Sequence, residues 1–96
     1  MTDPYPLGTS LDTAAAGPLR AALLGLVERR QPMLLDGAGV ARVGIACLQV
    51  LASARATAAA DGLGYHLADA SEPLAAMATL AGLAVVLDPV SSRDDR

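Results

Sequence analysis

The sequence predicts a small α/β domain with a mixed, mostly parallel sheet of about four strands and three main helices. Segments of helical periodicity alternate with short apolar runs typical of strands. This alternation favours parallel strands joined by right-handed crossovers. The 96 residues are the length of one small domain, so we expect a single domain over residues 1–96.

The first thirty residues predict an N-terminal arm and a helix. Residues 1–6 hold two prolines and are expected to form a loose arm, and the sequence leaves open whether residues 1–10 add a short strand around 5–8. Asp12 or Thr13 is placed to cap a helix. Pro18 lacks an N–H and breaks helices, so we expect one turn over residues 13–16 and the main helix over 18–30.

A strand and a second helix follow. The continuous apolar run 33–35, closed by Asp36 and Gly37, is typical of a strand buried on both faces. Glycines then mark a flexible connection into a helix over residues 44–60. Its sheet-facing residues recur at spacings of three and four: Val43, Cys47, Val50, Leu51, Ala54 and Ala58.

The last third of the chain predicts strand, helix, strand. Residues 65–69 form a short strand, and residues 71–82 a helix that Ser71 caps and Gly82 stops. The apolar run 83–88 is expected to be the last strand. Residues 89–96 are polar and are expected to fray.

Composition excludes several kinds of partner. The net charge is −3, lysine is absent and the seven arginines are scattered, so no cationic surface for nucleic acid is expected. One cysteine and one histidine cannot form a disulfide or a zinc site, and we expect no metal and no cofactor. Without a secretory signal or an apolar stretch of roughly 18–20 residues, the protein is expected to be cytoplasmic, with no membrane insertion.

No catalytic set can be assembled, so we expect no enzyme. The Gly37–Gly44 loop matches neither the Walker pattern nor the dinucleotide fingerprint. Cys47 lies on the apolar helix face and reads as a small buried hydrophobe. His66 is a candidate general base but has no partner, because the nearest candidate, Asp69, lies on the opposite face of the strand. A small nucleotide-binding protein or enzyme that uses these residues stays as an alternative.

Between Leu7 and Leu87 the order of these features resembles the STAS domain, the fold of bacterial anti-sigma-factor antagonists. The resemblance rests on the helix start at Leu11-Asp12, the strand ending in Asp36, the loop into the Leu48–Leu51 helix, the following strand, the Ser71-x-Pro73 helix start and the Gly82-Leu83 close. STAS domains are binding modules, so the resemblance implies a STAS-like fold and a non-enzymatic protein-interaction module.

Many STAS domains switch partners by phosphorylation of a Ser or Thr at the start of the second helix. The family motif resembles D-[ST]-[SAT]-G-L, and its leucine aligns with Leu48. Ile45 and Ala46 then stand at the hydroxyl positions. The resemblance implies that the phosphoacceptor position, Ala46, has lost its hydroxyl.

The expected partner-binding residues surround this helix start: Val40, Arg42, Ile45, Ala46 and Gln49. Alternatively, Val40 and Ile45 pack onto the domain itself. The resemblance implies a protein partner in bacterial signalling, a chemotaxis histidine kinase or a Ser/Thr anti-sigma kinase. A second possibility is an accessory subunit bound to the ATPase of a lipid-transport complex. Other STAS domains are tails of anion transporters, but this chain lacks a membrane segment and would have to be a separate subunit.

Overall fold

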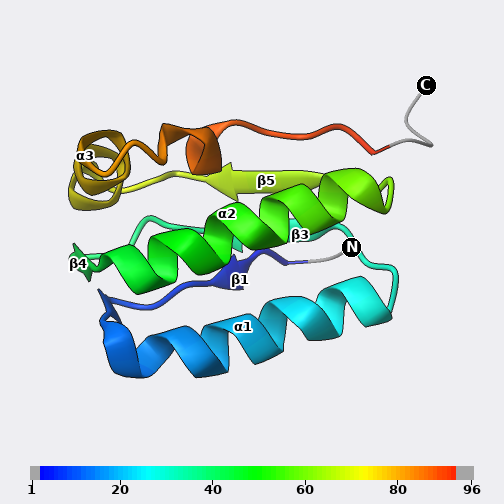
Figure 1. Cartoon of the computed structure of the whole chain (residues 1–96), viewed down its shortest axis with the longest axis horizontal. Helices are drawn as coiled ribbons and strands as arrows, with labels where there is room; N and C mark the ends of the chain where they lie inside the picture. The colour runs from blue at the N-terminus through cyan, green and yellow to red at the C-terminus, as the bar shows by residue number, and fades with distance from the viewer. Residues whose placement is uncertain (1–2, 93–96) are drawn as a thin grey trace.

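The computed structural model describes residues 3–92 and shows strands and helices in alternation (Figure 1). Its elements, in chain order, are β1 (Tyr5–Pro6), β2 (Ser10–Leu11), α1 (Thr13–Glu28), β3 (Met33–Asp36), β4 (Arg42–Val43), α2 (Ile45–Ala60), β5 (Tyr65–Ala68), α3 (Glu72–Leu80) and the 3₁₀ helix η1 (Ala84–Leu87).

The strands form two small parallel sheets. Three strands lie in the order β1-β3-β5, with Tyr5 opposite Leu35 and Leu35 opposite Leu67, and β2 pairs with β4. The predicted α/β class, the parallel pairing and the three helices are confirmed. The division into two sheets was not predicted. It follows from the chain between β1 and β2, where Gly8 turns with a φ of 92°.

The N-terminal segment contributes to both sheets. Within the residues assigned to a loose arm, Tyr5 and Pro6 form the edge strand β1, which is the short strand that the sequence had left open. Pro6 is compatible with this position because an edge strand does not need every N–H. Residues 1 and 2 lie outside the described part of the chain.

Helix α1 is continuous through Pro18, contrary to the predicted break. Asp12 caps it, its Oδ1 accepting the Ala15 N–H at 3.1 Å. Proline forces its predecessor out of the helical region mainly by clashing with that residue's Cβ, and Gly17 has no Cβ. Gly17 and Pro18 also lie on the exposed side, where water can satisfy the unpaired carbonyl.

The sheet is buried on one face, not on both as predicted for residues 33–35. Met33, Leu35, Tyr65 and Leu67 point towards the helices and are at most 6% exposed. The alternate residues of β3 and β5, Leu34 and His66 among them, are half-buried or exposed. Figure 1 shows α1 and α2 side by side over the sheet, with α3 at one end. The core therefore lies between one face of the sheet and the helices.

The run 83–88 forms the 3₁₀ helix η1 instead of the predicted strand. Gly82, with φ +74°, closes α3 and turns the chain away from the sheet direction. The edge of β5 is occupied a few residues later by Val90, whose backbone exchanges two hydrogen bonds of 2.8 and 2.9 Å with Tyr65. Val90 therefore belongs to the structured part of the predicted frayed tail, and residues 93–96 lie outside the described residues.

Candidate docking surface

The start of helix α2 is held in place by the two-stranded sheet. The Gly44 N–H donates to the Leu11 carbonyl at 2.9 Å, and the Thr9 carbonyl accepts the N–H groups of Ala41 and Arg42. Gly44 is the N-cap, in extended conformation, and has no side chain with which to cap the helix. Because β4 directly precedes Gly44 and β2 is hydrogen-bonded beside it, the backbone is held where α2 begins, at one end of the molecule.

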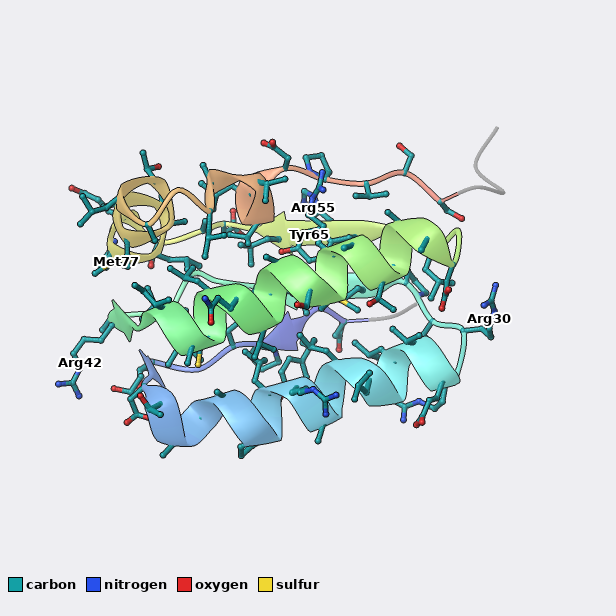
Figure 2. The ribbon with its side chains drawn as sticks, viewed as in Figure 1. Arg30, Arg42, Arg55, Tyr65 and Met77 are labelled. Carbon is teal, nitrogen blue, oxygen red and sulfur yellow. The ribbon has the colours of Figure 1, made fainter. Side chains whose placement is uncertain are left out.

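Four of the five predicted partner-binding residues gather at this end, and we call them the α2-start surface: Arg42, Ile45, Ala46 and Gln49. Ile45 is 55% exposed although it is a large aliphatic residue. Arg42 points away from the domain in Figure 2, and its guanidinium donates to the Ser10 Oγ at 3.0 Å. The surface therefore combines an exposed aliphatic side chain with polar groups beside it, just as protein interfaces combine an apolar centre with a polar rim.

Val40, the fifth predicted residue, does not belong to this surface. It is 2% exposed and lies in the core, so its expected exposure is corrected. Its carbonyl accepts the Ser71 hydroxyl at 2.6 Å, which ties the loop to the start of α3. For Val40 the alternative, packing onto the domain itself, is the observed one.

Cys47 is fully buried, as its position on the apolar face predicts. Its thiol donates to the Asp12 carbonyl at 3.3 Å and links α2 to the start of α1. Burial, followed by the negative charge of Asp12, raises the pKa of the thiol. A neutral, buried thiol is a poor nucleophile, so the geometry gives no support to covalent chemistry at Cys47.

The Gly-rich loop is shaped by packing. A Cβ on Gly37 would lie 2.8 Å from the Leu74 Cδ2 and 3.2 Å from the Leu67 Cδ1. The Gly37 N–H donates to the Ala68 carbonyl, so this amide is already used within the protein. Asp36 acts as a turn former, its Oδ1 accepting the Ala38 N–H at 2.9 Å. Close approach of β3 to α3 therefore explains Gly37 without a bound phosphate.

His66 and Cys47 lie on opposite sides of the sheet. His66 is exposed on the open face, whereas its neighbours Tyr65 and Leu67 face the helices that carry Cys47. Within residues 3–92 no group of three His, Cys, Asp or Glu side chains could hold a metal ion. The side chains considered for the enzyme alternative are therefore not brought together.

A groove of about 450 Å³ opens between α1 and α2 and was not predicted from the sequence. Its apolar lining comes mainly from Leu23, Leu24, Val27, Met33, Val50 and Ala54. Its polar lining comes from Arg20, Gln49, Ser53 and Thr57, and Ala16 and Ala46 complete one end. Helical periodicity had placed Val50 and Ala54 towards the sheet. They are half-buried because α1 covers them only in part.

Sequence reasoning also missed the contacts that hold the C-terminal segment. The buried Tyr65 hydroxyl donates to the Val86 carbonyl at 2.7 Å, and Arg55 Nε donates to the Asp88 carbonyl at 2.9 Å. Figure 2 shows Arg55 and Tyr65 at the same side of α2. No pattern in the sequence signals these bonds, because each joins residues more than 20 positions apart.

The fold is thus a parallel α/β domain that presents an exposed helix start at one end. The comparison with protein families gives the particular family. Residues 6–88 match the family model described as "Mlab, STAS domain", and the chain belongs to the STAS family. No curated protein and no solved structure matches the chain significantly. Among residues 3–92 there is no helix of the length and hydrophobicity that crossing a bilayer requires.

Proposed function

We propose that the protein is a constitutive docking module that binds a signalling kinase through the α2-start surface. The kinase is a chemotaxis histidine kinase or a Ser/Thr kinase of the anti-sigma type. STAS domains are generally non-enzymatic interaction modules, and the family match covers most of this chain. The observation that carries the proposal is the 55% exposure of Ile45 in the first turn of α2.

The chemistry of this turn supports binding without a phosphorylation switch. Ile45 and Ala46 occupy the positions where the family motif has hydroxyl groups, and neither side chain can form a phosphate ester. Phosphorylation would add about −1.5 to −2 charges at such a position and repel a docked partner. Without an acceptor here, binding follows the concentration of the partner and not its kinase activity.

The test replaces the exposed aliphatic side chain by a charge. Ile45→Asp places a carboxylate at a helix N-terminus, which the helix dipole favours, so the fold is retained. We expect calorimetry to show at least tenfold weaker binding to the kinase, which corresponds to about 1.4 kcal/mol. Leu80→Asp is the matched control, because Leu80 is an aliphatic side chain, 81% exposed at the end of α3, that does not belong to the α2-start surface. Equal affinity of wild type and Ile45→Asp would refute the proposed surface.

A second candidate is kept because the matching family model carries the description "Mlab, STAS domain" and no anti-sigma label. In this candidate the same surface binds the ATPase of a lipid-transport complex as an accessory subunit. Purification of the tagged chain from its own host distinguishes the two. Recovery of an ATPase whose binding is lost in Ile45→Asp supports the second candidate, and recovery of a kinase supports the first.

A further inference from the structure

The groove between α1 and α2 is large enough to receive part of a partner. It extends from Ala16 to Val27 along α1 and from Ala46 to Thr57 along α2. At 1.5 Å per residue, each wall is roughly 16 Å long, which is three helical turns. We propose that this groove binds an amphipathic helix of the partner protein, which carries a carboxylate opposite Arg20. The inference rests on the proposed function and names the part of the partner that docks.

The walls of the groove favour a helix over an extended peptide. Helices α1 and α2 begin at the same end of the molecule and run side by side (Figure 1). Their backbone N–H and C=O groups are used within each helix, so they offer no ladder to an added strand. Recognition must then come from side chains. A helix meets that requirement with apolar residues at spacings of three, four and seven, packed into the valley between two neighbours.

The depth of the groove fits side chains of that kind. Its floor is formed by Leu23 and Met33, which are 2% and 0% exposed. Leu24, 39% exposed, stands on the α1 side, and the half-buried Val50 stands on the α2 side. A docked helix would remove the exposed apolar surface of both walls from water, which is the dominant favourable term in association.

The charge of the groove selects the partner's chemistry. Arg20 is the one charged side chain among the described residues that line it. Within residues 3–92, Arg20 has neither a hydrogen-bond nor an ion-pair partner. A carboxylate on the bound helix would complete a charge-assisted hydrogen bond with this guanidinium, whereas a lysine there would be repelled. An acidic amphipathic helix is therefore the complementary occupant.

The groove is continuous with the α2-start surface. Ala46 and Gln49 belong to both, whereas Ile45 belongs to the α2-start surface alone. A partner that covers Ile45 can therefore place a helix along the groove without leaving the domain.

The test uses a display library of 14-residue peptides. Leucines are fixed at helical spacing, and each of the remaining positions can be Glu, Gln or Lys. Selection on the intact wild-type chain is expected to enrich Glu at one position relative to the leucines. Selection on Arg20→Glu is expected to enrich Lys at that same position. Arg29→Glu is the matched control, because Arg29 is an exposed arginine of the α1 C-cap that does not line the groove. It should give the wild-type preference.

Chemical shifts then locate the selected peptide. We expect the largest changes at Leu24, Val50 and Ser53, and at least tenfold weaker binding to Leu24→Asp. The inference would be overturned if the enriched residue did not change with residue 20, or if the chemical-shift changes were confined to another face. It would also be overturned if no peptide were selected while oleate bound in the groove. The peptide should still bind the Ile45→Asp variant, whose affinity for the kinase is expected to be lower.

If Ile45→Asp binds the kinase as wild type does but the peptide selection succeeds, the proposed function is rejected. If the peptide selection fails but Ile45→Asp weakens kinase binding, the inference about the groove is rejected.

Discussion

Tyr65 joins three parts of the molecule through one side chain. Its ring is 1% exposed under α2, its backbone pairs with Val90, and its hydroxyl donates to the Val86 carbonyl. Burial raises the pKa of Tyr65 to about 12, although the positive charge of Arg55 acts in the opposite direction. The folded state therefore holds the phenol in its neutral form, in which it can donate.

This pKa predicts a loss of stability in alkaline solution. Below the ordinary tyrosine pKa of about 10, the phenol is protonated in both states and the contribution is complete. As the pH rises towards 12, the unfolded chain releases the proton first, so the free energy of unfolding falls, by up to about 3 kcal/mol. Urea titrations from pH 9 to about 12 measure this decline.

Two variants isolate the effect. In Tyr5→Phe, Tyr65 is the sole tyrosine, and its tyrosinate absorbance should appear near pH 12 or together with unfolding. Tyr65→Phe should lose about 1–3 kcal/mol at neutral pH, because the Val86 carbonyl loses its donor, and should lose the pH-dependent decline. Ionisation of Tyr65 near pH 10 in the folded protein would contradict the argument.

At the level of elements, α1 shows how neighbouring residues decide whether a helix breaks. Gly17 and Pro18 are each unfavourable in a helix interior, yet Gly17 lacks the Cβ that would clash with the Pro18 ring. Packing of Leu19 and Leu23 in the core then stabilises the continuous helix. The carbonyl that lacks a donor because Pro18 has no N–H lies on the exposed side of α1, where water can bind it.

The pair predicts a sign change in a double-mutant cycle. Pro18→Ala restores a backbone donor at an exposed site and should stabilise the protein by about 1–3 kcal/mol. Gly17→Ala should destabilise the parent, where the new Cβ meets the proline ring, but should stabilise Pro18→Ala by about 1 kcal/mol. Urea denaturation of the four proteins gives the coupling energy. Additive effects of the two substitutions would show that Gly17 does not relieve Pro18.

For the whole molecule, the decisive feature is the layer arrangement. The helices cover one face of the three-stranded sheet, and the open face carries His66 and the half-buried Leu34. Adjacent residues of β5 thus have very different environments, since successive side chains of a strand point to opposite faces.

Two neighbouring substitutions test this arrangement. Leu67→Ala, at a side chain 6% exposed, should cost about 2–5 kcal/mol, because it removes buried methyl groups and leaves a cavity. His66→Thr, on the open face, should change stability by no more than about 0.5 kcal/mol. Chemical denaturation at one pH measures both. A loss of several kcal/mol in His66→Thr would show that a further layer covers this face.

Much of the fold could be predicted from residues close together in the chain. Ser71 was recognisable as a cap, and Asp12 was one of two cap candidates with Thr13. The apolar spacing over residues 44–60 predicted a helix, and the burial of Cys47 followed from that spacing. At the candidate site, the exposed Ile45 and the absence of hydroxyls followed from the sequence and the family resemblance. These features depend on local hydrogen bonds and on helical periodicity, and both are determined by residues close together in the sequence.

The remaining features were decided by tertiary structure. Val40 is buried in a loop that is hydrogen-bonded to Ser71, which lies 31 residues later in the chain. The apolar run 83–88 is not a strand because Val90 takes the edge of β5. The groove exists because α1 leaves part of α2 uncovered. Each result depends on contacts between segments that are distant in the chain. The hydrophobic effect is non-directional, so the apolar pattern of the sequence does not specify which distant segments meet.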